Sequence, residues 1–218
     1  LGEYYLENEQ WANAYKEYAQ LIKQKKHRLH TFSLYKGAWC LYRLGKNEQA
    51  LKYLEYIIKV GKEQDNTKVA SRKMVNKGKL EGEASRDLVI FYAEVGQPEN
   101  ASNYFHRTLG GDVSSHLERL AYFYSDKGNK EGSRLVFGQL ILEKPTHPKA
   151  FEFQYQIVQN FYYAKNTVKF KEELIRLILD YGPESAWMGQ NKGNAELIGN
   201  AEKLRENTLR TYILQQHQ

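Results

Sequence analysis

Small and apolar residues recur along this chain at helical spacing, and the pattern predicts helical hairpins. The clearest hairpin covers residues 35–56, where two short helices meet at the turn 43–46. Ala38 on the first helix and Ala50 on the second allow the two backbones to approach closely. The apolar seam of this hairpin consists of Leu41, Leu54 and Ile57. A single hairpin cannot bury its apolar face alone, so we expect further copies on both sides of it.

The chain contains such copies, each marked by a residue equivalent to Ala50. The five marker positions are Ala14, Ala50, Ala101, Ser133 and Phe170, and a large residue precedes each by nine positions, at Tyr5, Leu41, Tyr92, Tyr124 and Phe161. The steps between markers are 36, 51, 32 and 37 residues, close to the roughly 34-residue period of tetratricopeptide (TPR) arrays. The spacing therefore predicts an all-α fold, a right-handed TPR superhelix (α-solenoid) of about five helix-turn-helix units with a further C-terminal helix.

The predicted organisation is a single array over residues 1–218. Its units cover residues 1–29, 30–62, 84–111, 114–147 and 149–182, and residues 195–218 form the terminal helix. Because the second step is longer than the others, we interpret residues 61–83 as a basic inter-repeat insertion, a long linker with a short helix. The chain begins without Met, inside a helical pattern. We therefore expect it to be a fragment of a longer solenoid.

Composition and charge narrow the class of protein. The mean hydropathy is −0.72, and no apolar run reaches the ~20 residues that span a bilayer. One cysteine excludes a disulfide framework. Residues 23–86 contain 16 Lys or Arg and 6 Asp or Glu, a local charge of +10, so the rest of the chain carries −4 of the total +6. This basic half is either a solvated face or a surface for an acidic or anionic partner.

Patterns typical of catalysis are missing from the sequence. The six histidines show no helical zinc-protease spacing, and no Gly-rich loop ends in Lys-Ser/Thr. Cys40 lies within an apolar helix, where a thiolate is costly, so we expect a packed side chain rather than a nucleophile. The sequence therefore predicts no enzyme activity, cofactor or metal.

A concave groove is the stronger candidate for function, because first helices line the inner surface of stacked hairpins. Helical phase places a set of aromatic and charged residues there: Phe32, Tyr35, Trp39, Tyr42, Arg43, Arg86, Ile90, Glu94, Tyr122, Tyr155, Gln159 and Tyr162. Rigid aromatic anchors of this kind suit a peptide or protein segment. The alternative is that these rings only pack against neighbouring helices.

The basic segment supplies a second surface, for an anionic partner. Its residues are Lys68, Arg72, Lys73, Lys77 and Lys79. Binding of nucleic acid there would be mainly electrostatic and sensitive to salt. Base-by-base reading of RNA needs regular polar readers in each repeat, and the sequence shows none. Nucleic acid, or another anionic polymer, is therefore the alternative to a protein partner.

Three stretches resemble a particular group of TPR proteins. They are YKGAWCLYRLGK at residues 35–46, DLVIFYAEVG at 87–96 and LILDYGPESAWMGQN at 177–191. They are similar to the large TPR proteins of deltaproteobacterial cell envelopes, including those of adventurous gliding motility. The resemblance implies a non-catalytic scaffold in a periplasmic or outer-membrane complex. The fourth unit departs from the usual repeat, with Ser133 at the alanine position. A docking part of an enzyme whose catalytic domain lies elsewhere is a further possibility.

Overall fold

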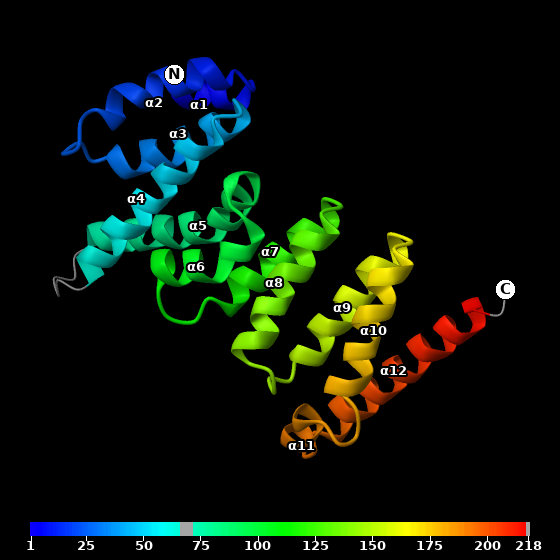
Figure 1. Cartoon of the computed structure of the whole chain (residues 1–218). Helices are drawn as coiled ribbons and strands as arrows, with labels where there is room; N and C mark the ends of the chain where they lie inside the picture. The colour runs from blue at the N-terminus through cyan, green and yellow to red at the C-terminus, as the bar shows by residue number, and fades with distance from the viewer. Residues whose placement is uncertain (66–71, 217–218) are drawn as a thin grey trace. The chain divides into compact units, whose positions relative to one another are not determined.

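The computed structural model describes the backbone of residues 1–65 and 72–216 and the side chains of residues 1–63 and 79–214. The described part of the chain is helical and contains no β-strand (Figure 1). Its elements are α1 (Gly2–Glu7), α2 (Trp11–Ile22), α3 (His30–Arg43), α4 (Asn47–Asp65), α5 (Arg72–Val95), the 3₁₀ turn η1 (Pro98–Asn100), α6 (Ala101–Leu109), α7 (Ser114–Asp126), α8 (Lys130–Glu143), α9 (Ala150–Tyr163), α10 (Thr167–Asp180), α11 (Ala186–Asn191) and α12 (Ala195–Gln216). Among these helices, none is both long and apolar enough to cross a membrane.

The marker positions explain why these segments pair. Ala14, Ala50, Ala101 and Ser133 are fully buried, and Phe170 is 4% exposed. The seam residues Leu41, Leu54 and Ile57 are also buried, as is the small residue Ala38 opposite Ala50. Small residues at these contacts let consecutive helices approach closely. The predicted all-α helical-repeat fold is thus confirmed.

The turns after α3, α7 and α9 share one geometry. After α3 the backbone enters the left-handed region at Gly45, with φ +73°, and the Lys46 amide donates to the Leu41 carbonyl at 2.9 Å. After α7, Gly128 adopts φ +81°. Glycine suits this position because it has no Cβ to clash. After α9 the same position is occupied by Lys165, with φ +55°.

The helices belong to two compact units, Leu1–His116 and Leu117–Gln218. A single array over residues 1–218 stays a prediction. The boundary falls within α7. Each unit is therefore described by itself.

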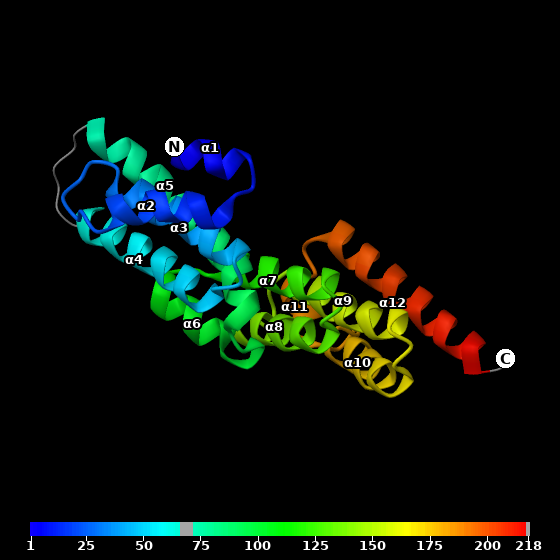
Figure 2. The same cartoon turned by 90° about the horizontal axis from the view of Figure 1, so that it is seen from above.

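In the first unit, α1 and α2 form the first helix pair, and α3 packs against both α2 and α4 (Figure 2). A small cluster of Ala14, Tyr18 and Cys40 joins α2 to α3. The Tyr15 and Tyr53 hydroxyls, on α2 and α4, lie 3.0 Å apart. Burial raises the pKa of the Cys40 thiol to about 11, as expected for a packed rather than a reactive cysteine.

The interpretation of residues 61–83 as a linker with a short helix is wrong for the residues that the structure describes. Helix α4 continues to Asp65, and α5 already begins at Arg72 and runs to Val95. Gly61 on α4 lies against Glu81 on α5, where a Cβ on Gly61 would meet the carboxylate. The long step between markers is thus an extension of two packed helices. Residues 72–83 contain no proline, and packing against α4 stabilises a polar stretch as a helix.

In the second unit, α8 packs against α9 through buried polar groups as well as rings. The Asn160 amide of α9 donates to the Ser133 hydroxyl of α8 at 3.0 Å, and both residues are buried. Asn160 also accepts from Ser125, while Lys130 donates to the Ser125 carbonyl at 2.9 Å. Serine at this alanine position is therefore a hydrogen-bonding partner, which accounts for the departure seen in the sequence.

The polar segment before the terminal helix, residues 184–194, contains a short helix. This helix is α11, capped by the Ser185 hydroxyl. Trp187 is 1% exposed, and its indole donates to the His147 carbonyl at 2.9 Å. Its ring contacts Phe151 and Tyr181 at centroid distances of 5.7 and 5.6 Å. Burial of this tryptophan overrides the polar character of its neighbours.

Candidate functional site

The predicted groove residues of α3 are engaged by the neighbouring helix α5. The Tyr35 hydroxyl and the Trp39 indole both donate to Asp87 Oδ2, at 2.7 and 3.1 Å. Burial, reinforced by the hydrogen bond to Asp87, raises the pKa of Tyr35 to about 12. At neutral pH the phenol is therefore a hydrogen-bond donor to a carboxylate supplied by the chain itself.

Two helical turns further along α3, at Tyr42, the arrangement repeats. The Tyr42 hydroxyl donates to Glu94 Oε1 at 3.2 Å, and its ring stacks on Phe91 with centroids 4.8 Å apart. Trp39 meets the same Phe91 ring edge-on at 5.0 Å. These rings pack α3 against α5, as the alternative interpretation of the aromatic residues describes.

The same kind of bond links helices elsewhere in the chain. On α7, the Tyr122 hydroxyl donates to Glu152 of α9 at 3.2 Å, and burial together with Glu152 raises the pKa of Tyr122 to about 12. On α6, the Tyr104 hydroxyl donates to Glu55 of α4 at 2.8 Å. A tyrosine facing a carboxylate on another helix is thus a recurring device of this fold.

The remaining predicted residues of the first unit lie apart from one another. Phe32 is half-buried against the α2–α3 cluster, beneath the ammonium of Lys36 at 5.4 Å. Arg43 is exposed and lies over the Trp11 ring at 5.4 Å. Arg86 is exposed on α5, where its Nε donates to the Gly82 carbonyl, and Ile90 is half-buried.

Three predicted residues of the second unit, Tyr155, Gln159 and Tyr162, come together at a hollow surface. Two adjoining pockets of about 440 and 230 Å³ share Tyr162, Tyr163 and Phe170 in their walls. We call this surface the α9–α12 groove; its lining residues are Tyr155, Gln159, Phe161, Tyr162, Tyr163, Lys165, Thr167, Phe170, Asn207, Thr208, Thr211 and Tyr212. They come from α9, the following turn, the start of α10 and α12.

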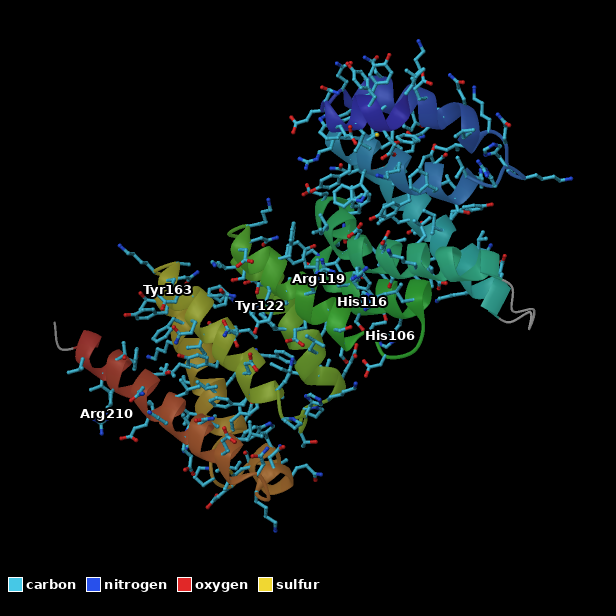
Figure 3. The ribbon with its side chains drawn as sticks, turned by 180° about the vertical axis from the view of Figure 1, so that it is seen from behind. His106, His116, Arg119, Tyr122, Tyr163 and Arg210 are labelled. Carbon is cyan, nitrogen blue, oxygen red and sulfur yellow. The ribbon has the colours of Figure 1, made fainter. Side chains whose placement is uncertain are left out.

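Helix packing positions this groove. Helix α12 packs against α10, and the Arg205 guanidinium of α12 donates to the Tyr181 carbonyl at 2.7 Å. The Tyr212 ring contacts Phe170 at a centroid distance of 5.8 Å. Figure 3 shows Tyr163 at the turn between α9 and α10, and Arg210 on α12. The groove therefore has walls from helices distant in sequence.

The groove is rich in hydrogen-bond donors. Among the described residues that line its two pockets, none is Asp or Glu, and Lys165 is the one cation. Burial, with a contribution from Tyr163, raises the pKa of Tyr155, which keeps its phenol protonated at neutral pH. Phenols and an ammonium thus surround an aromatic floor, whereas the hydroxyls of Thr208 and Thr211 donate to backbone carbonyls of α12 itself.

Sequence reasoning predicted three of the twelve lining residues of this groove and missed the other nine, of which four are instructive. Phe170 was identified only as a marker, and Tyr163 stands beside the predicted Tyr162. Lys165 is in a turn where its backbone conformation was not foreseen, and Tyr212 lies 50 residues beyond Tyr162. The two adjacent tyrosines at the end of α9 could have indicated Tyr163 as a lining residue. Nothing in the sequence indicated that α12 would pack beside α9 and place Tyr212 in the groove.

The proposed anionic patch falls mostly outside the described side chains. Lys68, Arg72, Lys73 and Lys77 lie there, so their surroundings are not described. Lys79 is exposed on α5. Among the described side chains, no group of three or more His, Cys, Asp or Glu could hold a metal ion.

Comparison with known proteins bears on the first unit. Residues 32–60, from Phe32 on α3 to Val60 on α4, match the tetratricopeptide repeat family. This is the hairpin on which the repeat was predicted. A search of curated proteins gave no match. The chain therefore contains a tetratricopeptide repeat, formed by α3 and most of α4, within an all-α helical-repeat fold.

Proposed function

We propose that this chain is a non-catalytic protein-interaction module that binds a peptide or protein segment in the α9–α12 groove. Tetratricopeptide repeats generally mediate protein–protein interactions. The observation that carries the proposal is the donor-rich aromatic groove between α9, α10 and α12. Its combination of rings and a few polar groups is typical of sites for small ligands and peptide side chains.

Aromatic residues suit such a site for a physical reason. Tyrosine buries a large ring at little cost in conformational entropy, because it has only two side-chain torsions to fix. Tyr163 is 74% exposed, and the Phe170 ring beneath it is 4% exposed. A peptide side chain entering here would cover an exposed ring and contact a fixed apolar floor.

The face between α3 and α5 is less suited to binding. Its phenols and its indole already donate to Asp87 and Glu94. A ligand for Tyr35 or Tyr42 would have to displace these carboxylates first. The predicted groove residues of α3, α5 and α7 stay a prediction, and we assign the primary site to α9–α12.

Selection from a phage-displayed random 12-residue peptide library tests this function. The wild-type chain should enrich peptides, and a Tyr163→Ala/Tyr212→Ala variant should lose at least tenfold in affinity for them, because both rings leave the groove. Tyr4→Ala is the matched control, since Tyr4 is 60% exposed on α1. Circular dichroism verifies that each variant keeps its helicity. Absence of enrichment, or equal affinity of both variants, would overturn the proposal.

The alternative of an anionic polymer is tested on the same protein. The probe is a 20-nucleotide oligothymidylate. An affinity for it that falls steeply between 50 and 200 mM salt would favour nucleic acid as the partner, because such binding releases counterions. Peptide binding through aromatic contacts should change much less with salt.

We also propose, from the resemblance of the three sequence stretches, that the protein acts as a scaffold in a bacterial envelope complex of the gliding-motility type. Fractionation of source cells that express the full-length protein tests the location. Recovery in the cytoplasmic fraction alone would contradict it.

A further inference from the structure

The tyrosines of α3 show which groups bind tyrosines at the equivalent positions of α9. Tyr35 and Tyr42 stand 15 and 8 positions before the marker Ala50, and Tyr155 and Tyr162 stand 15 and 8 positions before the marker Phe170. The two pairs thus occupy equivalent sites on α3 and α9. On α3, both phenols donate to carboxylates of α5.

On α9, the residues opposite are different. Asn207, Thr208 and Thr211 of α12 line the pocket with Tyr155 and Tyr162, and they carry no charge. The Tyr155 hydroxyl donates to no carboxylate in the described part of the chain, and its ring contacts Phe151. A pocket of about 230 Å³ remains beside it. Tyr155 therefore repeats the donor of Tyr35 without a carboxylate acceptor in the described part of the chain.

A second observation concerns Lys165. It stands five positions before its marker, as Gly45 and Gly128 do, and like them it has a positive φ. A residue with a Cβ is disfavoured in the left-handed conformation, because the Cβ crowds the following carbonyl oxygen. Glu9 is the other non-glycine residue with positive φ among those described, at the same position of the first turn. At Lys165, this conformation places the one cation among the described lining residues in the wall of the groove.

We propose that the α9–α12 groove binds an acidic segment of a protein partner. One carboxylate accepts a hydrogen bond from Tyr155, as Asp87 does from Tyr35, and a second pairs with Lys165 at the outer end of α9. An apolar side chain between them rests on Phe170 and Tyr212, as Phe91 rests on Tyr42. The inference rests on the proposed function and specifies the class of ligand.

Charge complementarity selects this occupant over a basic segment. The groove offers phenol and ammonium donors, and a carboxylate accepts from both. A Lys or Arg side chain would meet Lys165 and find no acidic partner among the described lining residues. Its charge would be left uncompensated against a partly buried surface.

The probes for the test are peptides selected from the 12-residue library and resynthesised with a fluorescent label. The selected sequences should be enriched in Asp or Glu near an aromatic or aliphatic residue. Replacing the acids by Asn or Gln should weaken binding at least tenfold. Lys165→Glu should lower the affinity for the acidic peptides at least tenfold. Lys192→Glu, which changes an exposed lysine after α11, should leave this affinity unchanged.

Tyr155→Phe isolates the phenol, because it keeps the ring and therefore the packing on Phe151. This variant should bind an acidic peptide about fivefold more weakly than the wild-type chain does, and it should bind the amide analogue with unchanged affinity. Equal affinity of acidic and amide peptides, or unchanged binding by both Lys165→Glu and Tyr155→Phe, would overturn the inference while leaving peptide binding intact. Displacement of the peptides by oligothymidylate, with loss of its binding in Lys165→Glu, would reassign the groove to nucleic acid. If no peptide is enriched, the proposed function itself fails.

Discussion

Tyrosine gives this protein a way to pack and hydrogen-bond with the same side chain. The ring of Tyr42 stacks on Phe91 while its hydroxyl reaches Glu94. Tyr35 and Trp39 share one carboxylate oxygen of Asp87. Buried polar groups of this kind need a partner, because a buried donor without an acceptor loses the hydrogen bond that it would otherwise make to water. The abundance of tyrosine, 17 residues in 218, follows from this dual use.

Asp87→Ala should lower the free energy of unfolding by about 1–3 kcal/mol, because two donors then lose their acceptor in a half-buried place. Urea unfolding followed by circular dichroism measures the change. In a double-mutant cycle with Tyr35→Phe, the two effects should be non-additive by about 0.5–1.5 kcal/mol. Strict additivity would show that the Tyr35–Asp87 bond contributes nothing to stability.

At the scale of helices, tyrosine–carboxylate bonds join α3 to α5, α4 to α6 and α7 to α9. Each bond fixes the register of one helix against another, because a phenol reaches a carboxylate only at one position along the axis. Other contacts at this scale serve the same purpose, such as the amide of Gln154 on α9, which donates to the buried Glu173 of α10 at 2.9 Å.

These bonds predict an alkaline titration. The pKa of Tyr35 and of Tyr122 is raised from 10 to about 12, mainly by burial and then by the carboxylate. A folded-state pKa above the unfolded value means that the stabilisation is fully present below pH 10 and is lost as the pH rises towards 12. Phenolate absorbance at 295 nm measures the titration, and Tyr35→Phe and Tyr122→Phe should each remove one late-titrating group. A midpoint near pH 10 for these groups would contradict the burial described here.

At the scale of the whole molecule, the division into two units has a consequence for unfolding. In helical-repeat proteins each element contacts only its neighbours, so a local loss of stability acts mainly on the unit that contains it. Trp11 and Trp39 lie in the first unit and Trp187 in the second. Tryptophan fluorescence can therefore report on each unit separately.

Two variant backgrounds make this test specific: Trp11→Phe/Trp39→Phe leaves only Trp187, and Trp187→Phe leaves only the probes of the first unit. Adding Asp87→Ala to each should shift the urea midpoint of the first unit's probes more than that of Trp187. Equal shifts would mean that both units unfold in one cooperative transition.

Local pattern was sufficient for the hairpins, because small residues and seam residues at fixed spacing determine where helices form and which faces they bury. Ala38, Ala50, Leu41 and Leu54 were predicted to pack and are fully buried. The pattern failed for residues 61–83 and gave no prediction of the helix within residues 184–194, because helix formation in both segments depends on a partner distant along the chain. Gly61 against Glu81 and Trp187 against Phe151 are such contacts.

The candidate site, too, could be predicted from the sequence only in part. Helical phase alone predicted three lining positions on α9, namely Tyr155, Gln159 and Tyr162. The packing of α12 over these residues, and the hydrogen bonds of Tyr35 and Tyr42 to Asp87 and Glu94, became visible only in the folded chain. Periodicity specifies which way a side chain faces along its own helix. It carries no information about which distant residue comes to face it, because that depends on how whole helices pack.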